Sequence, residues 1–208
     1  MLWIHIPKTG GTSVFMFFLQ KYSRSKVTLF TGRRNSVIDD PDLKKISLQH
    51  QTYQTLVKYS DVLKIDFCDD LKIFTIVRNP YHRIVSDLFG FEFIHEGSTQ
   101  EQVFDAIRNK YLYDDNLDNH NIPQFKFICD ENENIIPTIT ILKTETLKRD
   151  MNRFGFDDFN IQYGSTASKG ISVQTNEYIN YLNSDSISII NEYYSKDFEL
   201  FGYEKIIN

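Results

Sequence analysis

A segment near the amino terminus combines the residue types that bind an anion. Residues 5–13 read His-Ile-Pro-Lys-Thr-Gly-Gly-Thr-Ser. Gly10 and Gly11 let the backbone approach a ligand closely, and the helix expected to follow directs unpaired N–H groups and its positive dipole end to the same place. Lys8 adds a full positive charge. Further donors come from the hydroxyls of Thr9, Thr12 and Ser13. We interpret the segment as an anion-binding loop; the alternative is a glycine turn beside a solvated lysine.

A second set of anion-binding residues follows a later apolar run. Residues 77–86 read Val-Arg-Asn-Pro-Tyr-His-Arg-Ile-Val-Ser. Arg78 is expected at the carboxyl end of a strand, and Ser86 two turns into the helix that follows. A guanidinium group and a hydroxyl are suitable partners for a phosphate. The alternative for Arg78 is an ion pair with one of the many acidic side chains.

The order of residues in the first loop excludes one common phosphate-binding motif and resembles another. The Walker A loop places its lysine after the glycines, whereas Lys8 precedes Gly10 and Gly11. Residues 4–13 instead resemble the 5'-phosphosulfate loop of sulfotransferases that use 3'-phosphoadenosine 5'-phosphosulfate (PAPS). The likeness is closest to Golgi carbohydrate sulfotransferases related to the heparan sulfate and uronyl 2-O-sulfotransferases. Residues 78–86 match that family's 3'-phosphate motif, R-[DN]-P-x-x-R-x-x-S.

The resemblance implies a P-loop-like sulfotransferase fold, PAPS as donor and 3'-phosphoadenosine 5'-phosphate (PAP) as product. The sequence offers no convincing metal cluster, and sulfuryl transfer requires none. It assigns the loop from Lys8 to Ser13 to the 5'-phosphosulfate, with Lys8 also catalytic. Arg78 and Ser86 are implied to bind the 3'-phosphate, while Arg83 supports the loop. A late loop, Tyr163–Gly170, is similar to one that closes over the nucleotide in this family, which makes Lys169 a further candidate for the 3'-phosphate.

The acceptor hydroxyl needs a base within reach of the sulfur, and histidine is the usual choice. His50 follows a short apolar stretch and is expected to end a strand at the ligand-binding edge. The carbohydrate 2-O-sulfotransferases carry a catalytic histidine between their PAPS motifs, so the resemblance assigns the base role to His50. His120, in an H-x-x-P-Q-like stretch, is the alternative base or an acceptor contact. The other histidines, expected to be packing or surface residues, are His5, His82 and His95.

Strands and helices alternate along the chain, which predicts an α/β fold with a central, mostly parallel sheet flanked by helices. Ligands collect at the carboxyl ends of the strands in such sheets. The expected strands cover residues 2–6, 72–77 and 138–142. The expected helices cover residues 12–22, 80–93, 98–109, 144–154 and 184–194, with Asn79 as an N-cap and Ser98 opening a capping box. No linker divides the sequence, so we expect a single domain over residues 1–208.

Composition limits the partners and the setting. The formal net charge of −5 argues against a protein that coats nucleic acid, and no apolar run approaches the ~20 residues of a membrane span. The chain opens on an expected strand rather than a signal peptide, which favours a cytoplasmic protein unless an N-terminal anchor has been removed. The resemblance favours a carbohydrate acceptor, with small metabolites and tyrosine-containing peptides as the alternative acceptors. The sequence does not indicate the oligomeric state. The alternative functions are a kinase-like phosphoryl transferase and a non-catalytic nucleotide- or glycan-binding module.

Overall fold

The computed structural model describes residues 1–21, 38–41, 43–160 and 175–207. The strands are β1 (Leu2–Ile4), β2 (Ile73–Val77) and β3 (Ile139–Lys143). The α-helices are α1 (Gly11–Lys21), α2 (Tyr53–Lys58), α3 (Ser60–Leu63), α4 (Pro80–Gly90), α5 (Gln100–Ala106), α6 (Leu147–Arg153), α7 (Ser184–Tyr193) and α8 (Ser195–Phe201). Short 3-10 helices are η1 (Leu48–His50), η3 (Gln124–Phe127), η4 (Thr144–Thr146) and η6 (Thr175–Tyr181), and η2 (Ile107–Tyr111) is a π-helical turn.

Within the described residues the strands form one parallel sheet in the order β1-β2-β3. Leu2 pairs with Ile73, which in turn pairs with Ile139. Every residue of the central strand β2 is buried, as expected for a parallel strand covered on both faces. The three-stranded parallel sheet with flanking helices confirms the predicted α/β class.

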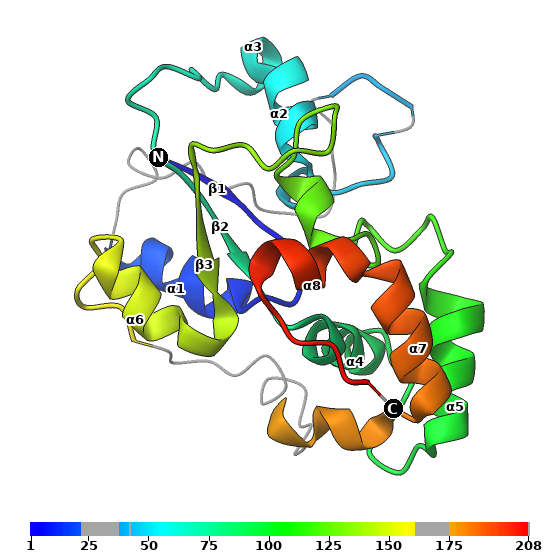
Figure 1. The fold of residues 1–208 in the computed structure, drawn as a ribbon. Coiled ribbons are helices and arrows are strands. Elements are labelled where there is room, and N and C mark those ends of the chain that lie inside the picture. Colours follow the sequence, from blue (N-terminus) through cyan, green and yellow to red (C-terminus); the bar gives the residue numbers. More distant parts are fainter. Residues whose placement is uncertain (22–37, 42, 161–174, 208) are drawn as a thin grey trace.

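Alternate residues of the strands pack against different helices. Trp3 and Phe74 face a cluster that contains Val14 and Phe18 of α1 together with Met151 of α6. The residues that alternate with them lie on the opposite face, against another cluster that includes α2, η3 and α8; they are Leu2, Ile4, Ile73 and Val77. Figure 1 shows α1 and α6 side by side next to the sheet. The sheet is therefore the middle layer of the fold, with helices packed against both of its faces.

A further hydrophobic cluster joins α4, α5, α7 and α8. It includes Leu88 of α4, Val103 of α5, Ile190 of α7 and Phe198 of α8. In Figure 1, α4 begins where β2 ends, and α5 and α7 lie beyond it. Among the carboxyl-terminal aromatic residues, Tyr194, Phe198 and Phe201 are buried, whereas Tyr193 and Tyr203 are partly exposed.

The helix starts follow local chemistry, with two corrections to the sequence predictions. Asn79 caps α4, because its Oδ1 accepts from the backbone N–H groups of Tyr81 and His82. The capping box of α5 is formed by Thr99 and Gln102, one residue later than predicted from Ser98. His50 does not end a strand but closes the 3-10 helix η1.

No helix of the described residues is long and apolar enough to cross a membrane.

Candidate active site

The loop between β1 and α1 has a backbone shape that only certain residues adopt readily. Gly10 has φ 92° and Lys8 has φ 65°, a left-handed conformation that costs a non-glycine residue roughly 1 kcal/mol. A Cβ on Gly11 would lie 2.1 Å from Nε2 of His5, so only glycine fits at the start of α1. The hydroxyl of Thr9 donates to the carbonyl of Ile6 at 2.8 Å and is buried. The loop therefore offers its backbone and Lys8 to the space in front of α1.

Two arginines hold this loop from the second motif. The guanidinium of Arg78 donates to the carbonyl oxygen of Lys8 at 3.0 Å. Arg83 donates through Nε to the carbonyl of Pro7 at 3.2 Å, and its other nitrogens donate to the carbonyls of Ile122 and His120. Arg83 is buried and so acts as an internal brace, as predicted. The second motif, residues 78–86, is thus hydrogen-bonded directly to the loop of the first motif, residues 5–13.

The side chain of Gln124 holds the backbone of Arg78 by two hydrogen bonds. Its side-chain Oε1 accepts from the Arg78 N–H at 2.9 Å, and its Nε2 donates to the Arg78 carbonyl at 2.8 Å. The buried carboxylate of Asp197 accepts from the backbone N–H groups of Gln124 and Phe125. Helix α8 is thereby linked through Gln124 to the position of Arg78.

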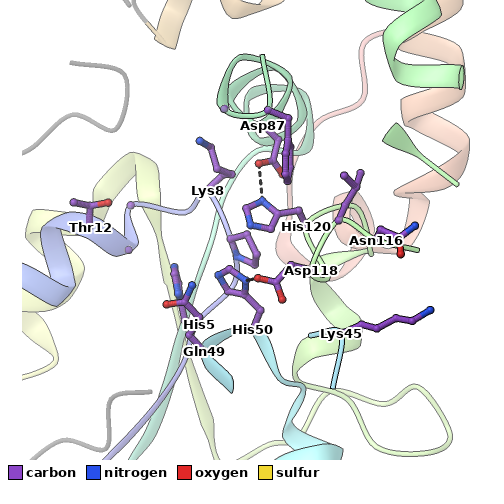
Figure 2. Close-up of a pocket in the computed structure, with 16 residues that line it drawn as sticks. His5, Lys8, Thr12, Lys45, Gln49, His50, Asp87, Asn116, Asp118 and His120 are labelled. Carbon is purple, nitrogen blue, oxygen red and sulfur yellow. Dashed lines mark hydrogen bonds and ion pairs between the residues drawn. The ribbon is translucent and has the colours of Figure 1, made fainter. Parts of the chain in front are cut away.

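A pocket of about 600 Å³ lies in front of the loop. Lys8, Gly10 and Gly11 line it on the α1 side, and the segments around His50 and His120 line the other side. Figure 2 shows the rings of His5, His50 and His120 gathered in one place, with Lys8 and Thr12 nearby. The ring centroids of His50 and His120 are 4.9 Å apart, edge to face, and those of His5 and His50 are 5.1 Å apart. The pocket therefore joins the glycine loop with Lys8 to a group of histidine side chains.

His50 is held by a carboxylate. Its Nδ1 lies 2.8 Å from Oδ2 of Asp118, and this oxygen also accepts from the Ser47 hydroxyl at 2.8 Å. Burial lowers the pKa of His50, against the hydrogen bond to Asp118, which raises it. A neutral His50 that donates from Nδ1 keeps the lone pair on Nε2, the arrangement a general base needs.

His120 is held in the same way by a different carboxylate. Its Nδ1 lies 2.7 Å from Oδ1 of Asp87, which is buried inside α4. The other oxygen of Asp87 accepts from the Tyr111 hydroxyl at 2.6 Å. Burial on its own would raise the pKa of Asp87, but the charge and hydrogen bond of His120 and the charges of Lys8 and Arg83 lower it. Asp87 is therefore a fixed anion behind the pocket.

The residues predicted to bind a 3'-phosphate lie near the end of β2 and on α4. Arg78 is buried, and its guanidinium carbon lies 5.6 Å from the ring centroid of Tyr178. The hydroxyl of Ser86 is buried and has no hydrogen-bond partner among the described residues. A buried hydroxyl without a partner is costly, unless a ligand satisfies it.

The family model for the sulfotransferase family matches residues 1–204. The chain belongs to the sulfotransferase family. No curated protein and no solved structure gives a significant match. Membership makes the chain a transferase of sulfuryl groups, and sulfotransferases generally use PAPS as donor.

In this sulfotransferase, several residues predicted from the sequence lie around one pocket and others do not face it. Lys8, Gly10, Gly11, Thr12 and His50 line the pocket. Ser13 and the side chain of Thr9 are buried beside the loop. Lys169 and the rest of its predicted loop lie outside the described residues. His95 is exposed, as expected, and His82 lies next to the ring of Tyr178.

Sequence reasoning missed both carboxylates that hold the sulfotransferase histidines. Asp118 precedes His120 by two residues, and Asp87 directly follows Ser86 of the phosphate motif. Asp118 and Asn119 both have positive φ, so the chain turns sharply here. The Asp118 carboxylate bonds to His50, while Nδ1 of the neighbouring His120 bonds to Asp87. The acidic residues around position 115 are visible in the sequence. The sequence does not show which histidine they contact, because Asp118 and His50 are separated by 68 residues.

Proposed function

We propose that this chain transfers a sulfuryl group from PAPS to a hydroxyl of a carbohydrate acceptor by in-line displacement. The observation that carries the proposal is the shared pocket of the Lys8 loop and the His50–Asp118 pair. PAPS supplies the sulfuryl group and leaves as PAP. The described residues suit the two phosphate ends of such a donor. The glycine loop and Lys8 line the pocket, and the buried hydroxyl of Ser86 has no hydrogen-bond partner among these residues.

On the donor side, the loop and Lys8 bind the 5'-phosphosulfate. The amino end of α1 contributes backbone N–H groups and its dipole, and Thr12 adds a hydroxyl at the pocket wall. Thr9 takes part through its backbone, since its hydroxyl is already bonded to Ile6. The positive charge of Lys8 offsets the negative charge that develops on the leaving oxygen. Arg78 and Ser86 bind the 3'-phosphate, and Lys169 joins them.

On the acceptor side, His50 takes the proton from the hydroxyl as it attacks sulfur. Asp118 holds the ring in one tautomer and stabilises the imidazolium that forms, as a carboxylate does behind a catalytic histidine. His120 faces the same pocket with its Nδ1 bonded to Asp87 and is the second candidate for the base. Both histidines are thus aligned before the acceptor binds, which lowers the entropic cost of the reaction.

The polar rim of the pocket supports a polyhydroxyl acceptor. Lys45, Gln49 and Asn116 line this rim, and Figure 2 places Gln49 near His5 and His50. Amide and ammonium groups bind the hydroxyls and any carboxylate of a sugar by directional hydrogen bonds. The resemblance to the carbohydrate 2-O-sulfotransferases points to the same class of acceptor.

Donor choice is the first test. Calorimetry should show binding of PAP to the full chain and much weaker binding of ATP with Mg²⁺. Preference for ATP with Mg²⁺ would replace the proposal with the kinase-like alternative. Turnover of labelled PAPS with a panel of sugars, small alcohols and tyrosine peptides then identifies the acceptor. PAP binding without turnover on any of them would favour the non-catalytic module.

A further inference from the structure

We propose that His50, Asp118 and His120 form a binding site for a divalent transition-metal ion such as Zn²⁺. A ring nitrogen of each histidine and a carboxylate oxygen of Asp118 lie within 4.8 Å of one another. The sequence predicted no metal site, because His50 lies 68 residues before Asp118 and its approach to Asp118 and His120 depends on the fold. The proposed ion is not needed for sulfuryl transfer; it is an additional ligand of the pocket.

The distances suit an ion with short bonds to nitrogen and oxygen. Zinc binds histidine and carboxylate at roughly 2.0–2.2 Å, so neighbouring ligand atoms in a tetrahedral shell lie roughly 3–3.5 Å apart. His50 Nδ1 and Asp118 Oδ2 are already 2.8 Å apart, close enough to be adjacent ligands. The three ligand atoms all lie within 4.8 Å of one another, so small side-chain rotations would bring them to this spacing. Two histidines and one carboxylate leave a coordination position open to water or an acceptor.

The surroundings orient the ligands as protein metal sites require. Asp87 accepts from Nδ1 of His120 at 2.7 Å and leaves its Nε2 lone pair for the ion. A carboxylate behind a ligating histidine fixes its tautomer and raises its basicity. Ser47 donates to both oxygens of Asp118 through its backbone N–H and its hydroxyl, which holds the carboxylate in place. His50 is almost fully buried, whereas 18% of the His120 side chain and 27% of the Asp118 side chain are exposed, so an ion can enter from the pocket.

The chemistry of the ligands selects the class of ion. Imidazole nitrogens with one carboxylate favour Zn²⁺ and similar first-row ions over Mg²⁺ or Ca²⁺, which prefer oxygen ligands. The ion takes the place of the hydrogen atom between His50 and Asp118. The ring proton of neutral His50 then moves from Nδ1 to Nε2, so no proton is lost and none is gained.

Metal binding would switch off the base. With its proton on Nε2, His50 becomes a donor at the position where it must accept the acceptor's proton. Zinc should therefore lower the turnover of sulfuryl transfer without weakening the binding of PAPS. This consequence rests on the proposed function, whereas the binding site does not.

The test is calorimetric titration of ZnCl2 into the full chain after treatment with chelator, in the absence of donor. One ion per chain is expected for the unaltered protein. His50→Ala, Asp118→Asn and His120→Ala should each weaken binding at least tenfold, and Asp87→Asn about tenfold through His120. His95→Ala is the matched control, because His95 is exposed and lies outside the pocket; its affinity should equal that of the unaltered chain.

Two further measurements make the outcome decisive. Co²⁺ in the unaltered protein reports the ligand geometry by its absorption spectrum, so the result does not depend on whether a variant folds. Melting temperatures of the variants show which are folded. The proposal is overturned if no binding occurs up to about 1 mM Zn²⁺, or if folded variants of the three ligands bind as tightly as His95→Ala. If the chain binds zinc but never turns over PAPS, the metal-site proposal stands and the proposed function is refuted.

Discussion

The guanidinium of Arg78 donates a hydrogen bond to the carbonyl oxygen of Lys8, across 70 residues of sequence. This bond joins the residue proposed for the 3'-phosphate to the residue proposed for the 5'-phosphosulfate. Because the Lys8 backbone is left-handed, a partner for its carbonyl helps to keep the loop in its binding shape. The two ends of the proposed nucleotide site are therefore linked by a hydrogen bond within the protein.

Arg78→Lys should weaken PAP binding about 10- to 100-fold, because a hydrogen bond between charged groups contributes about 1.5–3 kcal/mol and lysine cannot reproduce the planar fork. Calorimetry with PAP measures the effect. Arg149→Lys is the control, since Arg149 is exposed on α6 and pairs with its neighbour Asp150. Equal affinity of both variants would remove Arg78 from the phosphate site.

His50→Ala should lower kcat by roughly 10²- to 10⁴-fold, because the acceptor proton loses its base. Affinity for PAP should stay unchanged, since His50 lies on the acceptor side of the pocket. Steady-state kinetics with labelled PAPS and calorimetry separate the two quantities. If kcat survives in His50→Ala and is lost in His120→Ala, the base is His120.

Asp118→Asn should change the pH profile of the reaction. The carboxylate raises the pKa of His50 by its hydrogen bond and charge, so its removal lowers that pKa further. The acid limb of kcat against pH should therefore move to lower pH, while kcat at its plateau falls because the ring is less well oriented. An acid limb that stays in place would show that Asp118 has only a structural role.

Stability should decline in mild acid because of His5. Burial lowers the pKa of His5 well below its ordinary value of 6.5, so the unfolded chain binds a proton that the folded chain does not. The contribution of His5 to the free energy of unfolding is therefore complete above pH 6.5 and decreases as the pH falls below this value. The lowered pKa values of Asp87 and Asp118 act in a more acidic window, below 3.8.

Melting temperatures between pH 8 and pH 5 test this origin. His5→Gln, which cannot take up a proton, should show a smaller loss than the unaltered chain. His95→Gln should follow the unaltered chain, because that side chain is exposed. A decline of the same size in His5→Gln would assign the effect to other groups.

Gly11→Ala should destabilise the fold by about 1–3 kcal/mol and disrupt the loop, because the new methyl group meets the ring of His5. Urea unfolding gives the free energy, and PAP calorimetry gives the effect on the site. Gly97→Ala is the control: a Cβ there has only ordinary contacts, 3.6 Å from His95. No difference between the two variants would contradict the close packing of His5 against Gly11.

The sequence by itself determined the class of the fold and located the two segments proposed to bind anions. Apolar runs bounded by turn residues placed the strands within two residues of their observed ends, and Asn79 with Pro80 defined the start of α4. These features depend on neighbours along the chain, so local spacing is sufficient to find them. The order of Lys8 and the glycines was likewise enough to point to the sulfotransferase family.

Only the tertiary structure decided how the histidines are held. Asp118 reaches His50 from 68 residues away, and Asp87 reaches His120 from 33, so neither pair has a spacing that a sequence pattern records. The prediction that His50 ends a strand was wrong, because this histidine is positioned by a 3-10 turn and a distant carboxylate rather than by the sheet. Side-chain hydrogen bonds between remote segments depend on how the helices pack, and that packing is a property of the whole fold.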